Sequence, residues 1–445
     1  MEVTTCSWDR TTAGRIAGNV TNMFPSFDPG KLAPLMPGYH VWDSWFIMTE
    51  DGKVADFQGS RVLIALVRPL EASDQERIAY FVSTPQGFVA RGFLFPRKIY
   101  DDVREWSGST ILRDDGRIQT FYTIATGAQL DGVWQTNQRF ATAIQPFSFD
   151  QEGLFTVEGP EYHELLAEPD GELYETWQQA VDKELTMPNM HSVKRGSNQS
   201  DNFCFRDPKF FKDPCTKECY ILFEGNTGPK SGSPGGRVHQ KYLGTHVSTD
   251  FPVTPDDLKA NGCVGVLHLT NPNYSFGTFK RPWLVTNLVT DEIERINVMV
   301  IEGAYYLFVA GHGNKNSMIT VNPDLMNVDY MLGFRAHSFL GNLVPLNGSG
   351  VVVYQKSMGE MFSGQDQNQQ YTYSWMLVPT ADPELFECIS YANFCNDGGS
   401  IKPTKTSGPS LTIKVKKYHT VIVDKVYSVL PAPDPLKIKP PCKCS

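Results

Sequence analysis

The chain has 445 residues, of which 41% are hydrophobic and 12% aromatic, and it contains 37 glycines and 30 prolines. Its formal net charge is −9, and it has no basic block of the kind that follows a phosphate backbone, so we expect no nucleic-acid partner. No apolar run approaches the roughly 20 residues that a membrane-spanning helix needs, so we expect no membrane partner either.

Short apolar runs, each bounded by glycine or proline, recur along the chain and predict β-strands. They cover residues 62–67, 219–223, 305–309 and 351–354, and residues 411–426 alternate apolar and polar side chains in places. Such punctuated runs of β-branched and aromatic residues are typical of an all-β protein. No internal repeat with a period of about 40 residues stands out. The pattern favours a sandwich, a barrel or a propeller and does not choose among them.

Helical periodicity is sparse. The best amphipathic pattern runs from Tyr162 to Leu185, with a break at Pro169-Asp170-Gly171. The end of the chain, PAPDPLKIKPPCKCS, is too rich in proline for packed secondary structure. We therefore predict one domain over residues 1–445, with an N-terminal extension over about 1–30 and a Pro/Lys-rich tail over about 430–445.

The nine cysteines include three pairs that are close in sequence: Cys215 with Cys219, Cys388 with Cys395, and Cys442 with Cys444. Such pairs could form local disulfides in an oxidising compartment. A zinc site would need histidines or cysteine pairs at suitable spacing, and the nine histidines are scattered. We therefore expect no metal site made by these cysteines.

Four short motifs contain the strongest candidates for functional residues. In chain order they are Trp42-Asp43, Trp106-Ser107, Arg206-Asp207-Pro208 and Glu292-Ile293-Glu294-Arg295. Each alone has an ordinary interpretation as a turn cap, a surface ion pair or an exposed acidic strand. Together and in this order they resemble glycoside hydrolase family 68, the levansucrases, inulosucrases and bacterial-type β-fructofuranosidases. The resemblance implies an all-β fold, a five-bladed β-propeller with a central acidic pocket.

The resemblance also implies retaining cleavage of sucrose through a covalent fructosyl-enzyme intermediate. Matched to the family, Asp43 is the nucleophile, Asp207 stabilises the transition state, and Glu294 is the general acid/base. Arg206 is expected to pair with Asp207, and Ser107 to hydrogen-bond the nucleophile or the fructosyl unit. The substrate-binding residues implied by the resemblance are Trp42, Trp106, Ser107, Arg206, Glu292, Arg295, His312 and Tyr373.

The spacing of the two glutamates adds a physical argument. If residues 292–294 form a strand, the side chains of Glu292 and Glu294 project to the same face. Two carboxylates on one face repel each other, and this repulsion helps to keep one of them protonated near neutral pH. A retaining glycosidase needs such a protonated acid beside an ionised nucleophile, with the two carboxyl groups about 5–5.5 Å apart.

Some positions depart from the family pattern. Ser44, Phe46 and Ile296 stand where the family commonly has threonine, proline and a small residue. None of these removes a catalytic group, so they bear on acceptor preference more than on the core reaction. Some members of the family hold a structural calcium ion near the residue that matches Asp291. The other ligands cannot be matched in this sequence, so calcium stays open without being expected, and we expect no cofactor and no other metal.

Several alternatives stay open. Transfer of fructose to sugars or fructan and hydrolysis by water share one intermediate, so the sequence does not decide between a levansucrase-like and an invertase-like enzyme. A non-catalytic sugar-binding propeller and a different five-bladed glycosidase are weaker alternatives. The expected partners are sucrose and sugar acceptors, and the expected location is extracellular, although residues 1–14 have no signal-peptide pattern.

Overall fold

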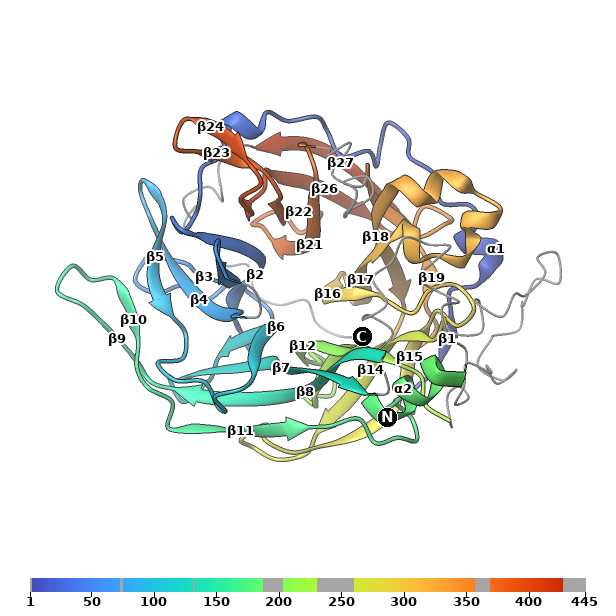
Figure 1. Cartoon of the computed structure of the whole chain (residues 1–445), viewed down its shortest axis with the longest axis horizontal. Helices are drawn as coiled ribbons and strands as arrows, with labels where there is room; N and C mark the ends of the chain where they lie inside the picture. Colours follow the sequence, from blue (N-terminus) through green and yellow to red (C-terminus); the bar gives the residue numbers. More distant parts are fainter. Residues whose placement is uncertain are drawn as a thin grey trace.

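The computed structural model describes residues 2–72, 75–130, 133–186, 203–229, 260–356 and 369–426, without the side chains of 128–135 and 183–186. Cys442, Cys444 and the Pro/Lys-rich tail lie outside the described residues. Figure 1 shows β-sheets arranged around a common axis. In the described part, five units of four main strands make up this arrangement.

Each unit is an antiparallel sheet of strands that follow one another along the chain. The first unit consists of β2 (Tyr39–Thr49), β3 (Val62–Pro69), β4 (Arg77–Thr84) and β5 (Gly87–Phe93). The second consists of β6 (Arg104–Leu112), β7 (Ile118–Leu130), β8 (Val133–Gln145) and β11 (Tyr162–Ala167). The third consists of β12 (Phe205–Lys212), β13 (Cys219–Asn226), β14 (Gly262–Leu269) and β15 (Gly277–Val285).

The fourth unit consists of β16 (Glu294–Ile301), β17 (Ala304–His312), β18 (Val328–Ala336) and β20 (Val351–Lys356), with the short β19 (Val344–Pro345) beside β18. The fifth consists of β21 (Thr372–Pro379), β22 (Leu385–Ala392), β26 (Ser410–Lys416) and β27 (His419–Val426), with β25 (Thr406–Ser407) paired to β22. These five units are the blades of a five-bladed β-propeller, which confirms the predicted fold class.

The first strand of every blade lies innermost (Figure 1). β2 contacts β6, β6 contacts β12, β12 contacts β16, β16 contacts β21, and β21 contacts β2, so the inner strands form a closed ring. All five have a register shift against their second strand at a matching place. The shifts lie at Trp42/Trp45, Trp106/Gly108, Arg206/Lys209, Glu294/Asn297 and Tyr373/Met376. A bulge re-aims side chains, so each blade turns a residue pair toward the axis at the same level.

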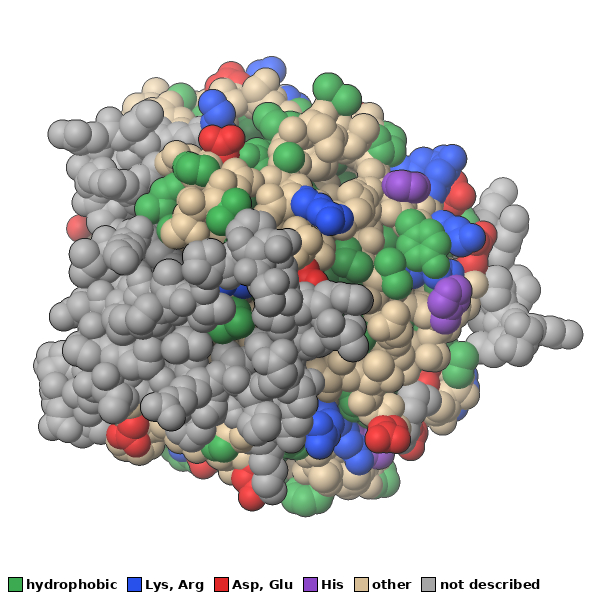
Figure 2. Space-filling model, turned by 90° about the vertical axis from the view of Figure 1, so that its right-hand side faces the viewer, with side chains coloured by type: hydrophobic (Ala, Val, Ile, Leu, Met, Phe, Trp, Pro, Cys, Tyr) green, Lys and Arg blue, Asp and Glu red, His purple; other side chains and the backbone are tan. Residues whose placement is uncertain are grey.

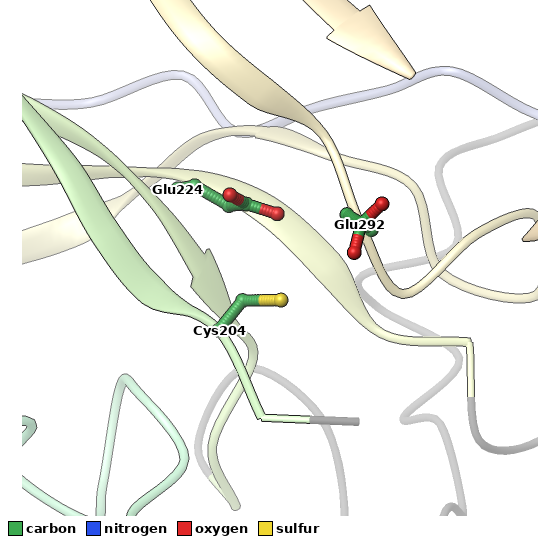
Figure 3. Close-up of side chains that lie close together, drawn as sticks. All are labelled: Cys204, Glu224 and Glu292. Carbon is green, nitrogen blue, oxygen red and sulfur yellow. The ribbon is translucent and has the colours of Figure 1, made fainter. Parts of the chain in front are cut away.

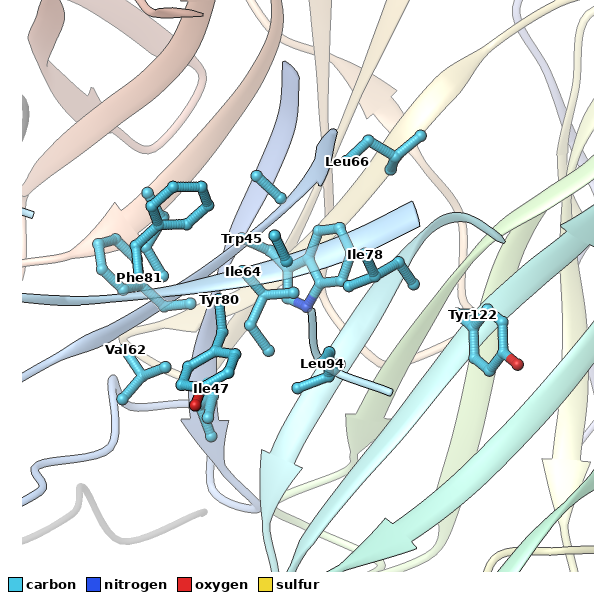
Figure 4. Close-up of a cluster of buried hydrophobic side chains, with 14 of the residues drawn as sticks. Trp45, Ile47, Val62, Ile64, Leu66, Ile78, Tyr80, Phe81, Leu94 and Tyr122 are labelled. Atoms are coloured by element: carbon cyan, nitrogen blue, oxygen red, sulfur yellow. The ribbon is translucent and has the colours of Figure 1, made fainter. Parts of the chain in front are cut away.

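Hydrophobic cores fill the spaces between neighbouring blades. The largest cluster joins the first blade to its neighbours, and Trp45, Ile64 and Phe81 lie within it (Figure 4). Each fully buried side chain of this size contributes about 1.5–3 kcal/mol relative to its exposed state. The packing between the blades therefore fixes the inner strands on which the motifs lie.

The smaller elements connect and cover the blades. They are β1 (Cys6–Ser7), α1 (Arg10–Ala13), η1 (Pro29–Lys31), the hairpin of β9 (Phe147–Phe149) and β10 (Phe155–Val157), α2 (Trp177–Thr186), η6 (Gly313–Lys315), η7 (Ser317–Thr320), η8 (Pro323–Asn327), and the hairpin of β23 (Cys395–Asp397) and β24 (Ser400–Lys402). β1 pairs in parallel with β15, and the chain after it runs outside the later blades (Figure 1). There the amide of Phe24 donates to the carbonyl of Tyr354, and that of Ile422 to the carbonyl of Thr21.

The predicted strand runs are confirmed, because β3, β13, β17 and β20 cover them and the segment 411–426 forms β26 and β27. The predicted helix over Tyr162–Leu185 is wrong in its first part, since Tyr162–Ala167 is strand β11 and only Trp177–Thr186 is helical. The exposed edge of β8 offers hydrogen bonds to β11, and this pairing overrides the helical pattern.

Among the described residues, no disulfide joins Cys215 to Cys219 or Cys388 to Cys395. No helix of the described part is long and apolar enough to cross a bilayer. On the face seen in Figure 2, the described basic, acidic and hydrophobic side chains lie interspersed. Charge of one sign therefore does not gather into a patch on the described part of that face.

Candidate active site

The bulges of the five inner strands bring the motif residues together around the axis. Each strand contributes one pair, namely Trp42-Asp43, Trp106-Ser107, Arg206-Asp207, Glu294-Arg295 and Tyr373-Ser374. In four pairs the second residue has a left-handed backbone, with φ of 43° at Asp43, 58° at Asp207, 57° at Arg295 and 61° at Ser374. Residues without glycine's freedom rarely adopt this conformation, and it clusters at functional sites.

Asp207 is held by groups from two other blades. The hydroxyl of Ser107 donates to Oδ1 of Asp207, and the backbone N–H of Arg295 donates to Oδ2 at 3.0 Å. The guanidinium of Arg295 reaches further and donates to the carbonyl of Ser44 at 2.8 Å. These bonds fix the Asp207 carboxylate and tie β12 to β2, β6 and β16. The sequence had led us to expect Ser107 on the nucleophile or the sugar, and the structure places it on Asp207 instead.

Arg206 lies at the centre of a glutamate cluster. Its Nε donates to Glu224 at 2.7 Å, and one terminal nitrogen donates to Glu292 at 2.8 Å and to Glu294 at 3.2 Å. The expected pair between Arg206 and Asp207 is therefore wrong. Neighbouring residues on a strand project in different directions, so Arg206 reaches the glutamates while Asp207 faces Ser107.

The pKa values of the two glutamates of the fourth motif are shifted in opposite directions. Both carboxylates reach Arg206, although β16 begins only at Glu294, so the assumed strand over 292–294 is wrong while the convergence of the two side chains is confirmed. Burial, followed by the charge of Glu292, raises the pKa of Glu294 to about 7. Burial alone would raise the pKa of Glu292, but Lys315, Arg206 and His312 outweigh it and lower this pKa to about 2. Burial and the repulsion that the spacing predicted thus keep part of Glu294 protonated near neutral pH, whereas Glu292 favours its ionised form.

His312 and Tyr373 complete the surroundings of Glu294. The hydroxyl of Tyr373 donates to Oε2 of Glu294 at 2.6 Å, and the rings of His312 and Tyr373 stack with their centroids 4.1 Å apart. His312 bonds to Asp329 at 2.8 Å through Nδ1, and its Nε2 lies 3.7 Å from Glu294. Burial opposes the charged form of His312, but Asp329 and the two glutamates prevail and raise its pKa to about 9. The structure therefore places an imidazolium beside the candidate acid/base.

The motif residues differ in their exposure. Asp43, Trp42 and Trp106 are partly exposed, and the side chain of Glu294 is 19% exposed. Arg206, Asp207, Glu292, Arg295, Ser107 and Tyr373 are buried. Burial raises the pKa of Asp43; Arg295 opposes this shift and Asp207 adds to it. A ligand can therefore reach Asp43 and Glu294, while the residues around them are locked in hydrogen bonds.

Two groups of side chains in the described part have metal-binding composition. Cys204, Glu224 and Glu292 converge in Figure 3, and Glu292, Glu294 and His312 form the second group. Both groups already contain cations, because Arg206 bonds to Glu224 and Glu292, Lys315 bonds to Glu292, and His312 carries a raised pKa. A metal ion would have to displace these charges, so the residues do not fit one. Asp291 belongs to neither group.

The sequence analysis missed several members of the site. Lys315 lies in η6, three residues after His312, and its ammonium bonds to Glu292. Asp329 lies in β18, opposite His312 across the sheet. Only the pairing of β17 with β18 brings Asp329 to His312, so no local pattern could have shown it. Glu224 and Asn226 of β13 also line the cluster, whereas Arg139 of β8 pairs with Glu168 away from it.

A glutamate with a pKa of about 7, close to an accessible aspartate, is the combination of acid and nucleophile that a retaining glycosidase uses. The chain matches the family model described as Levansucrase/Invertase, glycoside hydrolase family 68, over residues 2–429, and it belongs to this family.

Known proteins agree with this assignment. The chain is 30% identical over 429 residues to the levansucrase of Bacillus amyloliquefaciens, covering 90% of this chain and 84% of that protein. It is 27% identical over 427 residues to a protein of Geobacillus stearothermophilus named inactive levansucrase, covering 90% of this chain and 83% of that protein. The structure of an inulosucrase from Halalkalicoccus jeotgali bound to kestose superposes with a TM-score of 0.75 at 27% identity, covering 99% of this chain and 100% of that one.

Proposed function

We propose that the protein cleaves sucrose with retention and transfers the fructosyl unit to sugars or a growing fructan, and to water. The observation that supports the proposal most strongly is the common position of Asp43, Asp207 and Glu294. They come from three blades and lie at the matching bulges of the inner strands, around one axis. The family supports the substrate, since its similar members are named levansucrase and inulosucrase. We propose sucrose and sugar acceptors as partners, no cofactor, and action outside the cell.

The first half-reaction uses both exposed carboxyl groups. An oxygen of Asp43 attacks the fructosyl anomeric carbon, and the bond from that carbon to the glucosyl oxygen breaks. Glu294 gives its proton to that oxygen, so glucose leaves and a fructosyl ester remains on Asp43. A pKa of about 7 keeps a substantial fraction of Glu294 protonated near neutral pH, as this step requires.

The second half-reaction reverses the roles. The carboxylate of Glu294 takes a proton from water or from a sugar hydroxyl, whose oxygen attacks the anomeric carbon and releases Asp43. Asp207 is held by Ser107 and Arg295 in a fixed orientation and would stabilise the positive charge that develops on the fructosyl ring. Trp42 and Trp106 are partly exposed and would form apolar walls for the sugar.

The decisive experiment is incubation with sucrose alone, with glucose and fructose measured separately over time. Glucose in excess of fructose, with the missing fructose in oligomers or polymer, is the expected result. Equal amounts would make the enzyme a hydrolase. Release of neither sugar by a folded sample would contradict the proposal and favour a sugar-binding propeller, an outcome that a relative named inactive levansucrase makes worth testing.

A further inference from the structure

Lys405 lies beside Asp43, the proposed nucleophile, although more than 350 residues separate the two in sequence. It lies between β24 and β25 in the fifth blade. Its carbonyl accepts from the amide of Val41 at 2.9 Å, and its amide donates to Nδ1 of His40 at 3.2 Å. Both partners belong to β2, directly before the Trp42-Asp43 pair, so the backbone of Lys405 is fixed at that strand.

Two aromatic rings hold the side chain of Lys405. Its Nζ lies 5.0 Å from the ring centroid of Trp42 and 5.1 Å from that of Tyr391. These are favourable cation–π distances, so the ammonium has a defined place. Burial lowers the pKa of Lys405, while the carboxylates of Asp43 and Glu294 favour its charged form. The ammonium therefore lies in the field of both reacting groups.

The other cations of the site are already committed to protein acceptors. Arg206 and Lys315 bond to glutamates, Arg295 to the Ser44 carbonyl, and His312 to Asp329. In the described ranges, the Lys405 ammonium has neither an ion pair nor a hydrogen bond. Arg68 also lies over Trp42, at 5.9 Å, but it pairs with Glu76. Lys405 is thus the cation at Trp42 whose three N–H donors are open to a ligand.

This availability suits a sugar. Lys405 is only partly buried, and so is the Trp42 ring on which it lies. Hydroxyl groups accept hydrogen bonds, and a charged donor makes such bonds stronger than a neutral one. Within the proposed function, on which this inference rests, we propose that Lys405 contacts the substrate: its ammonium donates hydrogen bonds to hydroxyl groups of the sugar that lies against Trp42.

The test compares Lys405→Met, which keeps the aliphatic stem, with Lys405→Arg and Lys405→Gln, which keep donors. Lys402→Met, an exposed lysine of the same segment, is the matched control. We expect Lys405→Met to raise the KM for sucrose about tenfold while kcat changes less than about threefold, because a lost charged hydrogen bond weakens binding by about that factor. Arginine should restore most of the affinity and glutamine part of it, and Lys402→Met should behave as the wild type.

A second readout measures binding without turnover. In an Asp43→Asn background, calorimetric titration with sucrose should give a Kd about tenfold higher when Lys405→Met is added. Thermal unfolding of every variant shows whether weaker binding comes from the lost contact or from a disrupted fold. If the methionine variant does not fold, the comparison of the arginine and glutamine variants with the wild type provides the test.

The outcomes are distinguishable. Failure of the wild type to release glucose from sucrose would overturn the proposed function. A wild type that turns over sucrose, with unchanged KM and Kd in folded Lys405→Met, would overturn this inference alone. A shift in the acid limb of the pH profile with unchanged KM and Kd would also overturn it, and would show that Lys405 acts on the ionisation of Asp43, as Arg295 and Asp207 do. Arg68, Glu294 and Glu76 are the other charged groups that face Lys405 itself.

Discussion

The two carboxylate pairs of the site are positioned by different means. Asp43 and Asp207 lie at bulges with left-handed backbones, and Asp207 is held by a hydroxyl and a backbone amide. Glu292 and Glu294 have no left-handed backbone themselves, although Glu294 is the first residue of the bulge pair in β16. Their carboxylates are held mainly by the side chains of Arg206, Lys315 and Tyr373, with His312 close to Glu294.

This difference indicates that the orientation of a carboxylate and its ionisation are controlled by different structural features. A bulge fixes where a carboxylate points, which suits an attacking group and a group that faces developing charge. A ring of cations fixes which of two carboxylates keeps a proton, which suits a general acid. We therefore expect substitutions in the aspartate pair to change the rate, and substitutions around the glutamate pair to change the pH dependence.

The largest effect should come from Asp43→Asn. The amide cannot form the fructosyl ester, so kcat for sucrose should fall by about 10⁴-fold or more. Glucose release measures the rate, and thermal unfolding shows that the fold persists. Asp56→Asn, an exposed position in the same blade, is the control. Activity within tenfold of the wild type would refute the role of Asp43 as nucleophile.

Glu292→Gln should move the alkaline limb of the pH profile. The acid must carry its proton, so activity is lost as the pH rises through the pKa of Glu294, which is about 7. Removing the charge of Glu292 removes the repulsion and lowers this pKa, so the alkaline limb of kcat/KM should shift down by about one pH unit.

The control for this change is Glu302→Gln, because Glu302 is an exposed carboxylate in the turn after β16. It should leave the profile unchanged. An upward shift of the alkaline limb in Glu292→Gln would mean that Glu292 does not control the proton of Glu294.

His312→Gln should move the same limb in the opposite direction. The imidazolium lowers the pKa of Glu294, so its removal should raise that pKa and extend activity to higher pH by about half a unit. His337→Gln, an exposed histidine in the same blade, serves as the control. If His312→Gln and Glu292→Gln shifted the limb in the same direction, electrostatic control of Glu294 would be the wrong explanation.

The sequence predicted the parts of the site that local chemistry defines. The strands were visible because β-branched and aromatic runs between turns are a local signal, and the pair Glu292 and Glu294 was visible because its spacing is local. The partners were not visible, because Asp329 meets His312 only when β17 pairs with β18, and Lys405 meets Trp42 only when the fifth blade packs against the first. Lys315 is likewise far from Glu292 in sequence. Arg206 is the clearest example of what the sequence alone does not predict. It adjoins Asp207 in sequence, yet the strand geometry directs the two side chains to different partners.

The repeat of the blades was also invisible in the sequence. The five inner pairs share a place in the fold and little chemistry: they are Trp42-Asp43, Trp106-Ser107, Arg206-Asp207, Glu294-Arg295 and Tyr373-Ser374. What repeats is a bulge, which different side chains can form. A search for similar residues at a fixed period therefore finds nothing, although the backbone repeats five times in the described part.

The smallest expected effect tests the bulge without removing a carboxylate. Ser374 is buried and has φ of 61°, and a β-branched residue is strained there, so Ser374→Val should lower the free energy of unfolding by about 1–2 kcal/mol more than Ser374→Gly. Thr372→Val, two residues earlier in β21, is a near-isosteric control at a position without positive φ, and it should cost less. Chemical denaturation monitored by tryptophan fluorescence measures the difference. Equal stability of Ser374→Val and Ser374→Gly would mean that the left-handed position is not enforced, and then the bulges could not be what orients Asp43 and Asp207.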